Sequence, residues 1–255
     1  MISGIMIEMK TFFSKRGNGL AGILNNNWPD SPLLIFLHGF AGNKDENDLF
    51  IEAEKYFSER NYNTFRFDFE GAGDSEGEFK NSILARQVDD FETVLNEIKK
   101  TCNNTKIGVI GFSLGATIAL LYLTEDIDSY AFWSPVLFPY KDMFPRYNTE
   151  NIKQELLNKG FFEKAGLKVG HQIIDDLGRC DLKKNMQNLK KPVLLVHGTE
   201  DKYINYKSTV KGQQYFPNAC LEIISEANHS YKQNPIHRQI LFSKTFNWFE
   251  KQFRG

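Results

Sequence analysis

Short apolar runs alternate with amphipathic segments along most of this 255-residue chain. Six runs have the length and apolar character of buried strands: Leu33–Leu37, Thr64–Phe69, Lys106–Ile110, Ser129–Trp133, Val193–Val196 and Ala219–Ile224. Between them, apolar residues recur at helical spacing, as in Ser82–Thr101 and in the last segment around Phe242. This alternation indicates an α/β fold, in which a mostly parallel central sheet has helices on both faces.

Two departures from the alternation complete the expected architecture. Met6–Phe13 and Leu20–Asn25 are predicted to form an antiparallel hairpin at one edge of the sheet. The segment between Pro135 and Lys191 has helical stretches without a clear strand, and a long excursion of this kind is typical of a lid or an extra helical layer. No repeat or linker divides the chain. We therefore expect a single domain, 1–255, with a small helical lid insertion at about 136–190.

Composition and charge exclude several classes of protein. The chain is 41% hydrophobic and 25% charged, which is typical of a soluble globular protein. The net charge of -1 argues against binding to nucleic acid or to an anionic membrane. The N-terminal sequence MISGIMIEMKTFF alternates like a strand and does not have the pattern of a signal peptide. The three cysteines are widely spaced, which argues against disulfides and zinc and favours a reducing, cytoplasmic location.

An uncharged run, Ile107–Thr124, has the hydropathy of a membrane span or of buried core. The motif G-x-S-x-G lies near its middle, at Gly111–Gly115, where a continuous spanning helix would not place two glycines. A serine on a sharp strand-to-helix turn adopts a strained backbone, and glycines on either side leave room for it. The turn exposes the serine hydroxyl at the carboxyl end of a parallel sheet, so Ser113 is a candidate nucleophile. Taken alone, the motif also fits a structural turn.

A serine nucleophile needs a base, and the base needs an acid that orients it. Asp201 follows the strand Val193–Val196 in a glycine-bearing loop, and we choose it over the adjacent Glu200. His229 follows the last strand and precedes the last helix, which makes it the expected base. His38 and His197 end strands, and we assign structural hydrogen bonds to them. His171 and His237 are expected to face solvent.

Two backbone N–H groups are expected to form an oxyanion hole, which stabilises negative charge on the substrate oxygen. One belongs to Leu114, directly after the nucleophile, and the other to Phe40, in the loop after the strand Leu33–Leu37. A glycine-rich segment, Asp68–Gly77, raises the alternative of a dinucleotide site. Its glycine spacing does not fit, and an acid stands where the third glycine would be.

These motifs resemble the successive landmarks of the α/β-hydrolase family across nearly the whole chain. The landmarks are HGF at 38–40, DFEGAGDSEG at 68–77, GFSLG at 111–115, HGTED at 197–201 and NHS at 228–230. Within the family, the chain is similar to small bacterial serine esterases of the feruloyl/cinnamoyl-esterase group and to monoacylglycerol-lipase and thioesterase relatives. The HGF loop differs from the HGGG loop of one large lipase branch.

The resemblance and the motifs together predict a serine esterase that cleaves small or medium acyl or aryl esters through a Ser-His-Asp triad. Its expected partner is a small-molecule ester, and we expect no metal or cofactor. Aromatic residues suggest an apolar substrate pocket: Trp133, Phe138 and Phe144. Arg146 could bind a substrate carboxylate, but a solvated side chain is the preferred interpretation. Alternatives that keep the site are thioesterase, acyltransferase and peptidase activity. A non-catalytic ligand-binding protein is the alternative of another class.

Overall fold

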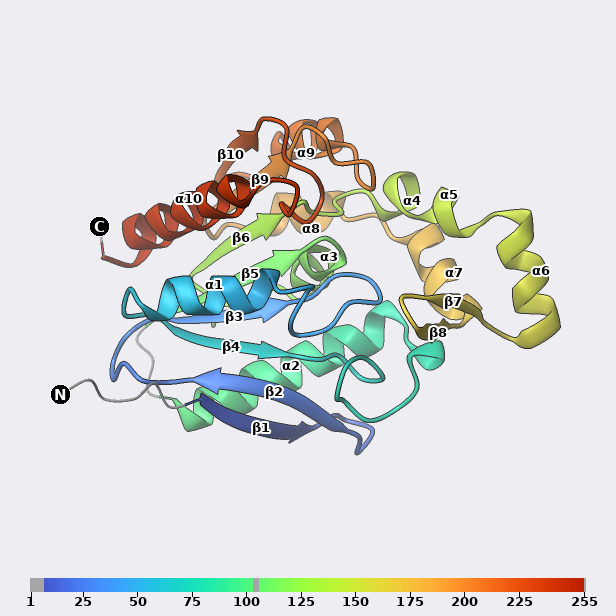
Figure 1. Ribbon diagram of the computed structural model, residues 1–255, viewed down its shortest axis with the longest axis horizontal. Coiled ribbons are helices and arrows are strands. Elements are labelled where there is room, and N and C mark those ends of the chain that lie inside the picture. Colours follow the sequence, from blue (N-terminus) through green and yellow to red (C-terminus); the bar gives the residue numbers. More distant parts are fainter. Residues whose placement is uncertain (1–6, 103–105, 255) are drawn as a thin grey trace.

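The computed structural model describes residues 7–102 and 106–254, and eight of its strands form one sheet in the order β1-β2-β4-β3-β5-β6-β9-β10 (Figure 1). Their bounds are β1 Ile7–Phe13, β2 Gly19–Asn25, β3 Leu33–Leu37, β4 Asn63–Phe67, β5 Ile107–Phe112, β6 Ser129–Trp133, β9 Val193–Gly198 and β10 Ala219–Ile224. β2 is antiparallel to β1 and β4, and the remaining neighbours are parallel. The predicted α/β class is confirmed. Met6, predicted to begin the first strand, lies outside the described residues.

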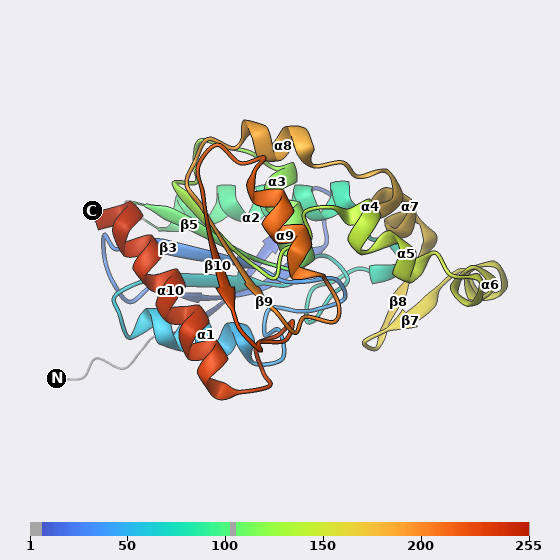
Figure 2. The same cartoon turned by 90° about the horizontal axis from the view of Figure 1, so that it is seen from above.

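Helices cover both faces of the sheet, which explains why the central strands are buried at every position and mostly apolar (Figure 2). One face packs against α1 (Leu49–Ser58) and α10 (Pro235–Arg254). The other packs against α2 (Leu84–Thr101), α3 (Leu114–Leu121), α8 (Lys183–Asn188) and α9 (Tyr206–Gln213). β3 shows the division clearly, because Leu34 and Phe36 face α1 and α10 while its other residues face α2 and α3.

The uncharged run is two buried elements joined by a turn. β5 ends at Phe112 and α3 begins at Leu114, so Ser113 is the single residue between them. All six residues of β5 are buried, and so are the first seven of α3. Within residues 7–102 and 106–254, no helix combines the length and the hydropathy that crossing a bilayer requires.

The segment between β6 and β9 lies at the end of the sheet where the parallel strands terminate (Figure 1). It contains α4 (Pro139–Asp142), α5 (Phe144–Tyr147), α6 (Glu150–Lys159), β7 (Phe162–Lys164), β8 (Leu167–Val169), α7 (His171–Arg179) and α8. The antiparallel hairpin of β7 and β8 corrects the expectation that this segment lacks strands. Each strand has only three residues, which is too short for a visible alternation of apolar and polar positions. α6 buries no residue and projects away from the sheet (Figure 2).

Candidate active site

Ser113 occupies a strained turn at the carboxyl end of β5. Its backbone angles, φ 53° and ψ −114°, are ones that a residue with a side chain rarely adopts. The chain can turn so sharply because of the two flanking glycines. A Cβ at Gly111 would lie 2.8 Å from the Cα of Ala116, and one at Gly115 would collide with the carbonyl oxygen of Leu37. The turn therefore presses α3 against β5 and β3 and leaves the serine at the edge of the sheet.

Asp201 and His229 meet beside this turn. The Nδ1 atom of His229 lies 2.6 Å from the Oδ2 atom of Asp201, whose side chain is completely buried. Because a carboxylate only accepts hydrogen bonds, Nδ1 carries the proton and Nε2 is left free to accept one. Glu200, the other acid considered, is exposed. The loops after β9 and β10 thus supply a histidine whose tautomer is set for accepting a proton.

The carboxylate of Asp201 receives a hydrogen bond from four groups. Its Oδ1 accepts the backbone N–H groups of Tyr203 and Ile204, at 2.8 and 2.9 Å. Its Oδ2 accepts from His229 and, at 2.9 Å, from Nε2 of His197. Burial by itself would raise the pKa of Asp201, but the hydrogen bonds from the two histidines outweigh it and hold the pKa below its ordinary value. Asp201 is therefore kept ionised.

His197 is a second histidine on the same carboxylate. Its Nε2 also lies 3.1 Å from the carbonyl oxygen of Ile204, so both groups facing Nε2 are acceptors and the proton belongs on this nitrogen. Its Nδ1 then accepts from the hydroxyl of Thr209 at 2.7 Å. The expectation that His197 forms structural hydrogen bonds agrees with this geometry, and its contact with Asp201 adds a link to the site that sequence reasoning missed.

We expect His197→Phe to lower the free energy of unfolding by about 2 kcal/mol, because a buried charged acceptor loses a donor. Since the lost donor stabilises the ionised form of Asp201, the pKa of Asp201 should rise from its depressed value, and the loss of folding stability in acid should begin at higher pH than in the wild type. Urea denaturation across a series of pH values tests both effects. His197→Gln, which can still donate an N–H, should show smaller changes. A destabilised variant with an unchanged pH dependence of stability would mean that His197 only supports packing.

Ser113 and His229 open into the same cavity, of about 340 Å³, which we call the Ser113 pocket. Its walls come from three parts of the chain. The loop after β3 contributes Phe40 and Glu46, and the loop after β9 contributes Tyr203. The insertion contributes residues of α5 and of the β7–β8 hairpin, with their neighbours: Met143, Arg146, Tyr147, Lys164 and Ala165. The ring of Tyr203 is 5.4 Å from that of His229, and the ring of Tyr147 is 4.9 Å from that of Phe40.

Two backbone N–H groups are placed beside Ser113 without a hydrogen-bond acceptor. Leu114 begins α3, where the first N–H groups of a helix have no partner within it. Phe40 lies in the loop after β3, which turns back so that the N–H of Gly42 bonds the carbonyl of Gly39 at 3.1 Å. Within the described part of the chain, no group accepts from the N–H of either Phe40 or Leu114. These are the two N–H groups predicted from the sequence.

Glu46 is a buried acid in the same loop that sequence reasoning missed. It is 6% exposed, and its Oε1 accepts the N–H of Gly39 at 2.5 Å. The absence of a side chain at Gly42 makes room for this carboxyl group. Burial raises the pKa of Glu46 to about 7, and the N–H of Gly39 offsets only part of that rise. The loop that carries Phe40 is therefore hydrogen-bonded to Glu46, a carboxyl group that titrates near neutral pH.

Glu46→Gln should change the dependence of stability on pH. Between pH about 4.5 and about 7, the folded protein keeps a proton on Glu46 that the unfolded chain loses, so stability falls as pH rises through this window. Glutamine removes this dependence and still accepts the N–H of Gly39. Relative to the wild type, the variant should gain up to about 3 kcal/mol between pH 4.5 and pH 8. Urea denaturation at both pH values measures the gain, and an equal difference at the two would contradict it.

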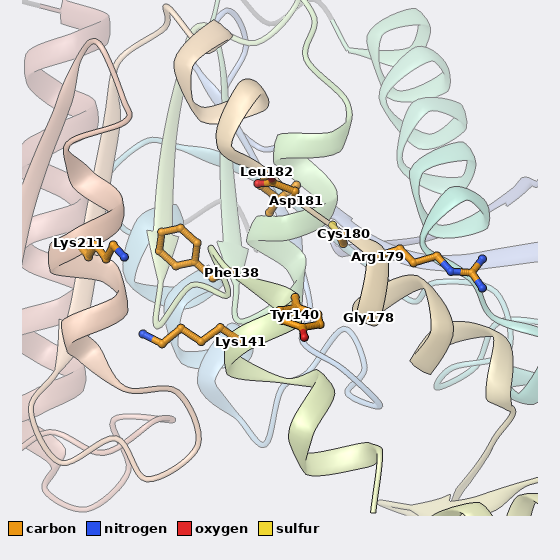
Figure 3. A pocket seen from close by; sticks show the side chains of 9 residues that line it. All are labelled: Phe138, Tyr140, Lys141, Gly178, Arg179, Cys180, Asp181, Leu182 and Lys211. Carbon is orange, nitrogen blue, oxygen red and sulfur yellow. The ribbon is translucent and has the colours of Figure 1, made fainter.

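The structure corrects the three aromatic residues predicted for the substrate pocket, because none of them lines the Ser113 pocket. Trp133 points to the face of the sheet covered by α10, where it is fully buried and its Nε1 donates to the hydroxyl of Thr245 at 3.0 Å. Phe138 instead lines a separate cavity of about 290 Å³ between α4, α7 and α9 (Figure 3). Phe144 stacks on Tyr140, with ring centroids 5.7 Å apart. All three pack the insertion or the core.

The remaining histidines are divided between the core and the surface. His38 is buried, with Nδ1 2.9 Å from the carbonyl oxygen of Gly39 and Nε2 accepting the N–H of Phe69, and burial lowers its pKa. His171 is exposed, as expected. His237 was expected to face solvent, but it is 6% exposed, because it lies on the inner face of α10. A helix that is apolar on one face does not reveal how wide its buried face is.

A family profile described as the alpha/beta hydrolase fold matches residues 32–179, which is more than half of the chain. The chain belongs to this family. The matched segment includes Ser113 and the loop of Phe40, whereas Asp201 and His229 lie beyond it.

Comparison with known protein sequences gives two levels of similarity. Lipase 3 of Moraxella sp. (strain TA144) is 24% identical over 261 residues, which cover 88% of this chain and 79% of the lipase. The 31.7 kDa protein in the traX-finO intergenic region of Escherichia coli is 37% identical over 86 residues, so the match spans 33% of this chain and only 29% of that relative.

Solved structures show that the fold is shared over almost the whole chain. Est1E of Butyrivibrio proteoclasticus, solved with ferulic acid bound, superposes with a TM-score of 0.84 at 21% identity over 96% of this chain and 100% of Est1E. The esterase Pf2001 of Pyrococcus furiosus gives a TM-score of 0.77 at 17% identity over 97% of this chain and 92% of the esterase. The predicted membership of the α/β-hydrolase superfamily is confirmed.

Proposed function

We propose that the protein hydrolyses carboxylic esters, with Ser113 as nucleophile, His229 as general base and acid, and Asp201 as the group that orients His229. One observation supports this most directly. A strained serine and a histidine with a free Nε2 open into one pocket, and the other nitrogen of that histidine is held by a buried, ionised aspartate. The likeness to Lipase 3, to Est1E with ferulic acid bound and to the esterase Pf2001 agrees with the proposal.

The reaction proceeds in two halves. His229 Nε2 takes the hydroxyl proton of Ser113 as Oγ bonds the ester carbonyl carbon, and the negative charge moves to the carbonyl oxygen. When the bond to the leaving oxygen breaks, His229 gives its proton to the departing alcohol, and an acyl-serine remains. A water molecule then gives a proton to His229 as it attacks the acyl carbon. The bond to Oγ breaks, and the proton returns to Ser113, which releases the carboxylic acid.

The free N–H groups of Phe40 and Leu114 are the proposed oxyanion donors. They are built into the fold before substrate arrives, so they stabilise the developing charge without reorganising. Removing one such donor costs on the order of 3 kcal/mol of transition-state stabilisation in serine hydrolases. Both donors here are backbone groups, so the loop after β3 and the turn at Ser113 determine their positions. Asp201, already ionised, stabilises the imidazolium form of His229 during the reaction.

A substrate panel tests the reaction class. It contains p-nitrophenyl acetate, butyrate and octanoate, a methyl cinnamate, an acyl-CoA and an aminoacyl amide. The aromatic rings of Phe40, Tyr147 and Tyr203 in the Ser113 pocket, and the ferulic acid bound by the neighbour Est1E, are the reasons for including an aryl acyl group. Rapid turnover of the oxygen esters supports the proposal. Turnover of only the thioester or the amide would assign the site to that bond, and no turnover with any substrate would favour a binding protein.

A further inference from the structure

Two cations stand at the outer part of the Ser113 pocket. Arg146 of α5 and Lys164 of β7 both line it, and both carry their charge near the ring of Tyr203. The guanidinium carbon of Arg146 is 5.5 Å from the centroid of that ring, and the Nζ atom of Lys164 is 5.9 Å from it. The same ring lies 5.4 Å from the ring of His229. The two positive charges and the proposed catalytic base therefore lie near the same aromatic ring.

Neither cation is neutralised by an acid. In the described residues, no carboxylate lies within ion-pair distance of Arg146 or Lys164, whereas Lys153 and Lys159 of the same insertion each pair with a glutamate. Glu163 precedes Lys164 in β7 and points to the opposite face of that strand. Arg146 uses one N–H to bond the carbonyl oxygen of Lys202 at 2.5 Å, which orients the guanidinium and leaves most of its donors available.

The charge in the pocket is distributed unevenly between its two ends. Glu46 is buried at the inner end, and a Cβ placed on Gly39 would lie 3.2 Å from its Oε1 and 3.3 Å from the Cβ of Ser113. Arg146 is exposed at the outer end, and Lys164 is partly exposed. The unpaired cations at the opening favour a negatively charged group there. The rings of Tyr147 and Tyr203 also line the pocket.

Resting on the proposed esterase function, we propose that the substrate carries an anionic group, a carboxylate or a phosphate, several bonds away from the ester, and that Arg146 and Lys164 bind it. A guanidinium suits the two oxygens of either group, and an ammonium adds a point charge. The apolar chain between the anion and the ester lies against the tyrosine rings. Arg146, which the sequence suggested is solvated, becomes a residue that determines specificity.

Three matched aryl esters test this inference on the whole protein. They are the p-nitrophenyl monoester of adipic acid, its methyl ester at the far carboxyl group, and the analogue that ends in a phosphonate. We expect the KM of an anionic ester to be about tenfold below that of the neutral one at low salt. Whichever of the carboxylate and the phosphonate lowers the KM more identifies the preferred anion. Raising the ionic strength to about 1 M, where the Debye length is about 3 Å, should remove most of the difference.

Variants assign the effect to the two side chains. Arg146→Gln and Lys164→Gln should each raise the KM of the anionic ester about three- to fivefold and leave the KM of the neutral ester little changed. The kcat for the anionic ester should stay nearly the same, because the contact with the anion is made equally in the ground and transition states. Lys168→Gln is the matched control, since Lys168 is an exposed lysine of the same hairpin that lies outside the pocket. It should leave all three KM values unchanged.

The outcomes separate this inference from the proposed function. Equal KM values for the anionic and neutral esters, or equal losses for both in the variants, would overturn the anion-binding role while ester hydrolysis itself stands. If none of the three esters is turned over and the same holds for the wider substrate panel, the proposed function fails. Selective loss of anionic-ester affinity in both variants, with Lys168→Gln unaffected, supports the inference.

Discussion

Ser113→Ala is expected to lower kcat for ester hydrolysis by about 10⁶-fold, because removal of the nucleophile leaves only substrate binding and the oxyanion donors. The fold should persist. The backbone N–H of Ser113 bonds the carbonyl of Trp133 at 2.9 Å, and its carbonyl accepts the N–H of Val136, so the backbone holds the turn in place. Steady-state rates with p-nitrophenyl butyrate measure the loss. Activity within tenfold of the wild type would show that another residue is the nucleophile.

Ser113→Gly is the companion variant. It should lose activity to the same extent, but glycine adopts φ 53° without the steric strain that a Cβ causes. We therefore expect its free energy of unfolding to exceed that of Ser113→Ala by about 1 kcal/mol. Urea denaturation of the two inactive variants measures the strain that the wild-type turn stores. A glycine variant no more stable than the alanine one would mean that the turn is relaxed.

Asp201→Asn is expected to lower kcat by about 10⁴-fold. The backbone N–H groups of Tyr203 and Ile204 require an acceptor at the Oδ1 position, so the amide NH₂ must occupy the other position, facing Nδ1 of His229 and Nε2 of His197. Both histidines would then have to change tautomer, and Nε2 of His229 would carry a proton in place of a lone pair.

The same variant should lose stability in a pH-dependent way. The depressed pKa of Asp201 stabilises the folded protein above the ordinary carboxyl pKa of about 3.9, and this contribution disappears as pH falls through the folded value. The stability difference between wild type and Asp201→Asn should therefore be largest above pH 4 and shrink below it. Glu200→Gln, at the exposed neighbouring acid, should change neither activity nor stability. A Glu200→Gln variant as inactive as Asp201→Asn would contradict the assignment.

The strands and the serine turn were predictable because their signals are local. β3, β5 and β9 are buried on both faces, and a run of apolar residues follows from that burial. The glycines on either side of Ser113 are required by contacts within a few residues and with the adjacent strand. Asp201 and His229 follow the ends of neighbouring strands of a parallel sheet, so their loops emerge at the same edge as the serine.

The walls of the pocket could not be predicted in the same way. Trp133 is the last residue of β6, and its side chain can point to either face of the sheet. Because β6 is buried at every position, its sequence shows no alternation that would predict which face Trp133 meets. Burial of Glu46 depends on three successive residues with positive φ, Glu46, Asn47 and Asp48, in a loop without a glycine at those positions. Lys164 reaches the pocket through a short hairpin whose docking is set by tertiary contacts.

The measurement that tests the central claim most directly is covalent labelling with a fluorophosphonate, followed by mass spectrometry of the digested protein. A fluorophosphonate reacts with serines that an adjacent base activates. We predict a single adduct on the peptide that contains Ser113, no adduct in Ser113→Ala, and slower labelling in Asp201→Asn. An unlabelled wild-type protein, or an adduct that persists in Ser113→Ala, would contradict the assignment of Ser113 as the activated nucleophile.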